Sequence, residues 1–171
     1  MTKSACFTGH RPEKMSITED KLRYRLKCCI LDHIYEGYDT FYCGMARGVD
    51  IIAAEIVMGI KQHYLLNLIA AVPFANQSNG WSHDWKERYE NVLKNSNDIV
   101  VLSKEYNKNC LWYRNKYMVD NSTLVIAYFD GKSGGTAQTI DYAKRCGVKI
   151  VNLSVNNYTT NQLKFQGFTD S

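Results

Sequence analysis

The stretch that decides the fold is residues 39–57, DTFYCGMARGVDIIAAEIV. Residues 39–43 are rich in aromatic and β-branched side chains, which predicts a strand. Two glycines, Gly44 and Gly48, follow directly and indicate a turn. From Val49 to Ile60 apolar residues recur at helical spacing, which predicts a helix. A strand, a glycine turn and a helix in this order are the building unit of an α/β protein.

The same alternation continues in both directions along the chain. The sequence predicts strands over residues 4–8, 39–43, 66–72, 98–102, 123–129 and 148–153. It predicts helices over residues 49–60, 82–95, 109–121 and 134–145, and one more that starts at a capping box with Ser16 as N-cap and ends at Gly37. The uninterrupted apolar run over residues 66–72 is typical of a strand buried on both faces. We therefore expect a Rossmann-like, doubly wound α/β fold, with a mainly parallel sheet of about six strands and helices on both faces.

Length and composition fit one ordinary globular domain. The 171 residues suffice for one domain, expected over residues 1–154, and the polar end of the chain predicts a loose tail over residues 155–171. The formal net charge of +4 suits an anionic ligand, but it is dispersed, so nucleic acid is not expected as a partner. No stretch resembles a membrane span or a signal peptide, which predicts a cytoplasmic protein with no membrane partner. The six cysteines form no CxxC pair and have no zinc-ligand spacing, so reduced thiols are expected, with no metal and no cofactor.

Three turns that each follow a predicted strand carry the candidate chemistry. In the first, residues 8–12 (TGHRP), Gly9 allows close approach of a ligand to the backbone. Arg11 offers a fork of donors suited to phosphate or carboxylate, and His10 can donate to the same group or stack on a ring. A tight turn with a solvated arginine is the alternative.

The second and third turns each open a helix. In residues 44–50 (GMARGVD), Gly44, Arg47 and Gly48 surround free amides that favour an anion, while Asp50 either caps the helix or holds a ribose hydroxyl. Residues 130–136 (DGKSGGT) form a candidate phosphate cradle, made by Ser133, Gly134, Gly135 and Thr136. An ordinary glycine-rich loop is the alternative for this turn, but all three turns are expected at one edge of the sheet, where open α/β sheets bind ligands.

Two further segments offer aromatic and basic side chains near the same edge. After the strand over residues 66–72 come five candidate ligand-binding residues, Phe74, Gln77, Trp81, Arg88 and Tyr89. Trp81 or Tyr89 is expected to cover a base or a ribose, although an aromatic stripe at helical spacing is more often core. Arg114 and Asn115 belong to a predicted helix and either turn toward the pocket or lie on a solvated face.

With these motifs in view, the chain resembles the YpsA-like family of the SLOG superfamily, named for its Smf/DprA and Lonely-guy members. The matching segments run in the family's order over about residues 4–153: TGHRP at 8–12, GMARGVD at 44–50, AVPF at 71–74 and GGT at 134–136, together with the residues just named from Gln77 to Asn115. The resemblance implies a Rossmann-like domain that binds a nucleotide-derived small molecule, such as an ADP-ribose-like or cyclic nucleotide signal. It also implies a sensor or a sequestering protein, as phages carry, and a homodimer or higher homo-oligomer.

Two alternatives remain open. One is a nucleotide or nucleoside-monophosphate hydrolase of the phosphoribohydrolase type. Those enzymes carry an acidic residue three positions after the threonine of their Gly-Thr motif, where this chain has Thr139, so Asp50 or Glu55 would have to supply the carboxylate. This departure favours a protein that is not an enzyme. The other alternative is DprA-like binding of single-stranded DNA or a protein interaction in cell division.

Overall fold

The strands and helices alternate along the chain as the sequence predicts. In the computed structural model, which describes residues 2–155, the strands are β1 (Lys3–Gly9), β2 (Tyr38–Cys43), β3 (Asn67–Val72), β4 (Asp98–Val101), β5 (Leu124–Tyr128) and β6 (Lys149–Asn152). The helices are α1 (Glu19–Tyr35), α2 (Val49–Ile60), α3 (His83–Asn95), α4 (Cys110–Asp120) and α5 (Gly135–Arg145), and a short 3-10 helix spans Pro12–Lys14. All the strand pairs are parallel and form a sheet in the order β4-β3-β2-β1-β5-β6. The predicted Rossmann-like α/β fold is therefore confirmed.

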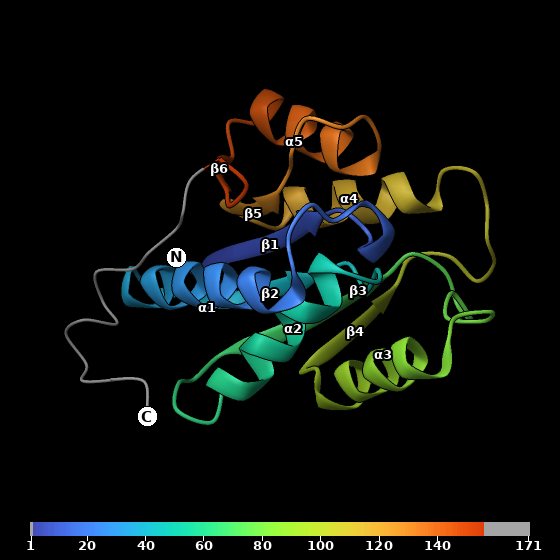
Figure 1. Ribbon diagram of the computed structural model, residues 1–171, viewed down its shortest axis with the longest axis horizontal. Helices are drawn as coiled ribbons and strands as arrows, with labels where there is room; N and C mark the ends of the chain where they lie inside the picture. Colours follow the sequence, from blue (N-terminus) through green and yellow to red (C-terminus); the bar gives the residue numbers. More distant parts are fainter. Residues whose placement is uncertain (1, 156–171) are drawn as a thin grey trace.

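Helices cover both faces of this sheet (Figure 1). Helices α1, α2 and α3 lie on one face, and α4 and α5 lie on the other. The paired strands β1 and β5 supply both layers of core because successive side chains of a strand point to opposite faces. Phe7 and its partner Ile126 belong to the core under α1 and α2, whereas Cys6 and its partner Val125 belong to the core under α4 and α5.

The order of the strands places a crevice between β1 and β5. The chain adds β2, β3 and β4 outward from β1, and then returns through α4 to place β5 on the other side of β1. The loops that follow β1 and β5 therefore leave in opposite directions, which opens a space beyond their carboxyl ends. We therefore expect a ligand-binding site at this edge of the sheet.

Two glycines bring the turns after β1 and β2 into contact. A Cβ at Gly9 would overlap the side chain of Val49, so the start of α2 packs directly on the end of β1. Gly48 has a φ of 95°, a left-handed conformation that favours glycine, and a Cβ there would lie 2.5 Å from the carbonyl oxygen of His10. These turns are held at a fixed separation by backbone contact.

The start of α1 differs from the prediction. Thr18, rather than Ser16, is the N-cap, and its Oγ1 accepts a hydrogen bond from the backbone nitrogen of Lys21. Ser16 instead shares a hydrogen bond of 2.7 Å with the hydroxyl of Tyr128 at the end of β5. The capping box was wrong because a competing capping residue stands two positions later and Ser16 has a tertiary partner, which the local pattern does not reveal.

The cysteines, the apolar character of the helices and the end of the chain were also subjects of prediction. Five of the six cysteines are buried free thiols, and Cys146 is exposed. Within residues 2–155, none of the helices combines the length and apolar character that crossing a membrane requires. The predicted tail over residues 155–171 lies outside the described residues, apart from its first residue.

Candidate functional site

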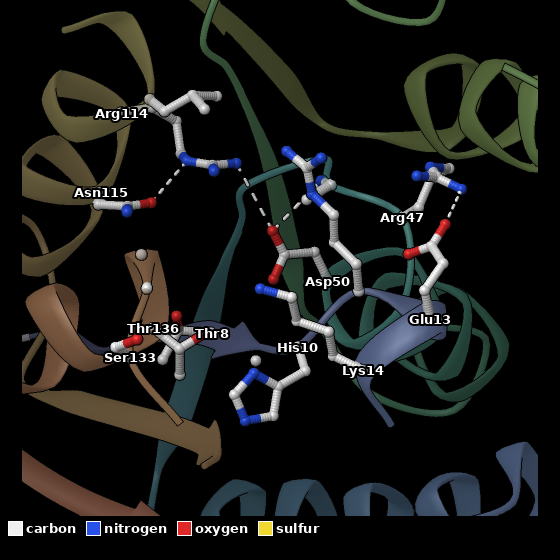
Figure 2. Close-up of a pocket in the computed structure, with 16 residues that line it drawn as sticks. Thr8, His10, Glu13, Lys14, Arg47, Asp50, Arg114, Asn115, Ser133 and Thr136 are labelled. Carbon is white, nitrogen blue, oxygen red and sulfur yellow. Dashed lines mark hydrogen bonds and ion pairs between the residues drawn. The ribbon is translucent and has the colours of Figure 1, made fainter. Parts of the chain in front are cut away.

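The three glycine turns converge on one cavity at the crevice between β1 and β5. The cavity has a volume of about 460 Å³ and is lined from β1, the loops after β1, β2 and β5, and helices α2, α4 and α5. Eleven of the predicted ligand-binding residues line it, namely Gly9, His10, Arg11, Arg47, Asp50, Arg114, Asn115, Ser133, Gly134, Gly135 and Thr136. Its volume lies in the range of small-molecule sites in proteins. Figure 2 draws the lining residues gathered around it and labels ten of them.

The N-terminus of α5 presents its backbone amides to this cavity. Gly134 precedes the helix with a φ of 142°, and no side chain caps the helix start. The first helical hydrogen bond runs from the nitrogen of Gln138 to the oxygen of Gly134, so the amides of residues 135–137 have no carbonyl partner within the helix. The hydroxyls of Ser133 and Thr136 lie beside them (Figure 2). Open amides and a helix dipole make this end of α5 a suitable place for an anion.

The N-terminus of α2 already has an anion. The carboxylate of Asp50 accepts a hydrogen bond of 3.2 Å from the backbone nitrogen of Ala46. Its Oδ2 also lies 3.5 Å from the Nη1 of Arg114, and both side chains are buried. The carboxylate therefore already accepts a hydrogen bond from one of the turn amides that the sequence offered to a ligand phosphate.

The ion pair of Asp50 and Arg114 is closely enclosed. Arg114 donates to the carbonyl of Gly44 and, through Nε, to the Oδ1 of Asn115 at 2.8 Å. A Cβ at Gly44 would overlap the guanidinium of Arg114 and lie 2.7 Å from the carboxylate of Asp50. Burial raises the pKa of Asp50, although Arg114 acts in the opposite direction, and burial likewise lowers the pKa of Arg114 against the effect of Asp50. The pair costs desolvation energy, yet it holds α4 against the turn after β2.

A histidine and a carboxylate join the first turn to the third. The Nε2 of His10 lies 2.7 Å from the Oδ1 of Asp130, and Lys132 lies 3.0 Å from the other oxygen of this carboxylate. Hydrogen bonding by Lys132, together with its backbone amide and His10, lowers the pKa of Asp130. Asp130 therefore remains an anion that orients His10 at the wall of the cavity. The sequence offered Asp130 only as the first letter of a turn and gave no indication of this contact.

Cations surround the mouth of the cavity. Arg47 pairs with Glu13 at 2.5 Å, as Figure 2 shows. Among residues 2–155, Arg11 and Lys14 have no ion-pair partner within 4 Å and are exposed at the opening. These two cations line the same cavity as the start of α5. The sequence did not single out five further lining residues, Thr8, Glu13, Lys14, Ala46 and Leu111.

A smaller cavity of about 180 Å³ adjoins the first. It is lined by Phe74, Gln77 and Trp81, which were predicted as ligand-binding residues, and by Tyr106 from the loop after β4. The two cavities share the side chains of Arg11, Ala46, Arg47, Leu111 and Arg114.

Other predicted residues lie elsewhere. Arg88 and Glu55 pair with each other at 2.7 Å in a network between helices, and neither lines the cavities. Tyr89 is buried in the core and packs edge-on against Trp81. Gly44 and Gly48 line neither cavity. Gly44 lies against the ion pair of Arg114 and Asp50, and Gly48 lies against the backbone of His10. Thr139, at the position where the hydrolases carry an acid, is fully buried and donates to the carbonyl of Gly135.

Comparison of the sequence with known proteins finds one matching family and several relatives. The YpsA model, described as the YspA SLOG family, matches residues 5–166. The SPbeta prophage-derived protein YoqJ of Bacillus subtilis (strain 168) is 30% identical over 139 residues, which cover 73% of this chain and 81% of YoqJ. A UPF0398 protein of Bacillus thuringiensis (strain Al Hakam) is 23% identical, and the match covers 95% of this chain and 91% of that protein.

Two solved structures share the fold. DprA from Helicobacter pylori superposes with a TM-score of 0.62 at 18% identity, covering 96% of this chain and 73% of that one. DprA from Streptococcus pneumoniae gives 0.61 at 15% identity and covers 97% of this chain, which spans only 57% of that DprA. The H. pylori structure is described as showing a single-stranded DNA binding mode. The expectation that nucleic acid is not a partner was therefore wrong, because a dispersed charge does not exclude DNA binding by a protein of this fold.

Proposed function

Because this chain belongs to the YspA SLOG family, we propose that its larger cavity binds the phosphate of a nucleotide-derived small molecule. The observation that carries the proposal is the open N-terminus of α5, which faces the same cavity as Arg11 and Lys14. Amides that point at a ligand, a favourable helix dipole and two cations without a close ion-pair partner are together what phosphate recognition needs. Binding without turnover would make the protein a sensor or a sequestering protein.

The arrangement of carboxylates supports binding over hydrolysis. Glu55 lies outside the cavity, and Asp50 is held by Arg114 and the amide of Ala46. Glu13 lines the cavity, but its carboxylate is paired with Arg47 at 2.5 Å. Thr139 offers no carboxylate beside the start of α5. Hydrolysis of an N-glycosidic bond needs a carboxylate free to stabilise positive charge or to activate water.

The test is to incubate the full chain with a nucleotide panel: nucleoside monophosphates and diphosphates, cyclic nucleotides and ADP-ribose. Calorimetry measures binding, and chromatography shows whether the compound is recovered unchanged. The proposal expects one class to bind with one-to-one stoichiometry and to be recovered intact. Steady conversion to products would establish a hydrolase instead, and absence of binding across the panel would refute the proposal. Mass spectrometry of small molecules released by heating protein purified from its own host would identify the physiological ligand.

Single-stranded DNA is a second candidate ligand, supported by the fold shared with H. pylori DprA. The same amides and arginines would then hold one phosphate of a longer strand. Binding of an oligonucleotide that contacts several phosphates weakens steeply as salt rises, whereas binding of one small anion weakens little. Titration of an oligothymidine at several salt concentrations therefore separates the two candidates.

A further inference from the structure

The smaller cavity has a wall chemistry different from that of the larger one. Its sides are aromatic: Phe74 and Trp81 come from the segment after β3, and Tyr106 comes from the loop after β4. Phe74 and Tyr106 meet edge to face, with ring centroids 5.4 Å apart. The guanidinium of Arg47 lies 5.9 Å from the centre of the Trp81 ring. Such walls suit a flat, electron-rich ring, which stacks on aromatic side chains and on arginine.

The walls of this cavity are held in place before any ligand arrives. Tyr89 extends from the core and contacts Trp81 edge-on at 5.3 Å. Gln77 is buried, and its Nε2 donates to the carbonyl of Met45 at 2.7 Å, which fixes the floor. Tyr106 differs, since it is 66% exposed on a loop and buries little of its own surface. An exposed aromatic that lines a cavity contributes little to core packing, so a ligand role accounts for it better.

The junction between the two cavities is cationic. Arg11, Arg47 and Arg114 line both of them, and Arg47 and Arg114 lie on facing sides in Figure 2. Their charges are only partly compensated, because Glu13 and Asp50 are the carboxylates that pair with two of the three. A ligand that spanned both cavities would place its negative groups at this junction.

We propose that the smaller cavity is the subsite that binds the base of the ligand, with the ring of the base against the aromatic walls formed by Trp81 and Tyr106. The phosphates lie at the arginine junction and reach toward the amides of α5. This inference rests on the proposed function and adds which residues bind the base of the nucleotide-derived ligand. It requires the base to contribute to affinity and not merely to be tolerated.

The test compares ligands that differ only in the base. Binding of AMP, GMP, CMP and UMP is measured by calorimetry against ribose 5-phosphate, which keeps the sugar and phosphate. We expect the best nucleotide to bind about 5- to 150-fold more tightly than ribose 5-phosphate, as stacking of one base on aromatic side chains provides.

Two variants locate the effect. Tyr106→Ala should remove most of the advantage of the base while leaving ribose 5-phosphate binding unchanged. Tyr113→Ala is the matched control, because Tyr113 is 52% exposed on α4 and lies outside both cavities. Trp81→Ala, checked for folding by circular dichroism, should act as Tyr106→Ala does.

The outcomes distinguish the ring subsite from the phosphate site. Equal binding of nucleotides and ribose 5-phosphate would overturn the ring subsite and leave the phosphate site standing. An equal loss of both ligands in Tyr106→Ala would also overturn it. If the folded wild-type protein bound none of these compounds and none of the nucleoside diphosphates, cyclic nucleotides or ADP-ribose of the wider panel, the proposed function itself would fail.

Discussion

At the scale of single residues, Gly135 is a position where a side chain can be added without crowding. The nearest atom to a Cβ there is the Nδ2 of Asn115 at an ordinary 3.8 Å, and its φ does not require glycine. We predict that Gly135→Asp folds normally but weakens ligand binding by about 100- to 1000-fold. Two like charges about 4 Å apart repel by roughly 4 kcal/mol at an effective dielectric constant of about 20.

The control at this position is Gly135→Ala, which adds a methyl group without charge and should keep both the fold and the binding. Calorimetry with the ligand from the nucleotide panel measures the affinities, and circular dichroism verifies folding. Undiminished affinity in Gly135→Asp would show that the start of α5 is not the phosphate site.

Gly44 is the opposite case, because a side chain there meets the buried ion pair. We predict that Gly44→Ala lowers the free energy of unfolding by about 1–3 kcal/mol, the usual cost of overfilling a packed site. Gly59→Ala is the control, since nothing lies within 4 Å of a Cβ at that position in α2. Alanine favours the helix by up to about 1 kcal/mol there, so this variant should be neutral or more stable. Urea unfolding of both variants tests the pair, and equal stabilities would contradict the packing described for Gly44.

The sequence predicted many of the residues that line the cavity, but it did not predict which side chains form ion pairs with one another. Arg88 was a reasonable candidate ligand group because arginine suits phosphate, yet its carboxylate partners come from two other helices. No local pattern reveals a contact between residues 69 positions apart, such as that of Arg88 with Glu19. Asp130 was missed for the same reason, since its contact with His10 exists only once β1 and β5 pair.

At the scale of elements, an ion network joins three helices on one face. Glu19 of α1, Glu55 of α2 and Arg88 of α3 are linked at 2.7–2.8 Å, and Arg23 contacts both carboxylates. Partial burial acts to raise the pKa of Glu19, but Arg88 and Arg23 outweigh it and lower that pKa below its ordinary value. The stability that Glu19 contributes is therefore present above the ordinary glutamate pKa and is lost as pH falls through the lowered one.

We predict that Glu19→Gln is less stable than wild type by about 0.5–1 kcal/mol at pH 7, as partly exposed ion pairs contribute little more. The difference should shrink as pH falls below about 4.5, near the ordinary glutamate pKa. Urea unfolding across this range measures it. A difference that stayed constant down to pH 3 would mean that charge at Glu19 is not the cause.

Prediction of elements succeeded where the local pattern alone decides. The glycine turns and apolar periodicities located five helices. Helix α4, for example, begins and ends within one residue of the predicted range 109–121. The pattern could not distinguish the two helix starts at the site, because glycines precede both α2 and α5. What separates them is Asp50, whose position beside Arg114 depends on the packing of α4.

At the scale of the whole molecule, a ligand in the larger cavity would touch turns that belong to both halves of the sheet. It would add contacts between the β1–β2 side and the β5 side that exist only in the folded state. We predict that ligand at about 100 times its dissociation constant stabilises the protein by about 2.7 kcal/mol and raises the melting temperature by about 5–10 °C. Differential scanning fluorimetry measures this increase, and Gly135→Asp should not show it. An equal increase in that variant would place the ligand elsewhere.

The strand order followed only in part from the sequence. Alternating strands and helices with right-handed crossovers predicted a parallel sheet, but which strand lies beside β1 depends on packing between distant segments. The convergence of the turns on one cavity was predicted correctly because the carboxyl ends of parallel strands meet at one edge whatever their order.

The central place of β1 also bears on how the polypeptide emerges from the ribosome. One edge of β1 can pair as soon as β2 is synthesised, but its other edge waits for β5, more than one hundred residues later. At translation speeds of about 5–20 residues per second, β1 is paired on one edge only for roughly 4–17 s, the time needed to synthesise the chain from the end of β2 to the end of β5. A nascent chain stalled before residue 124 would expose the unpaired backbone edge of β1, which makes such fragments natural clients for chaperones and proteases.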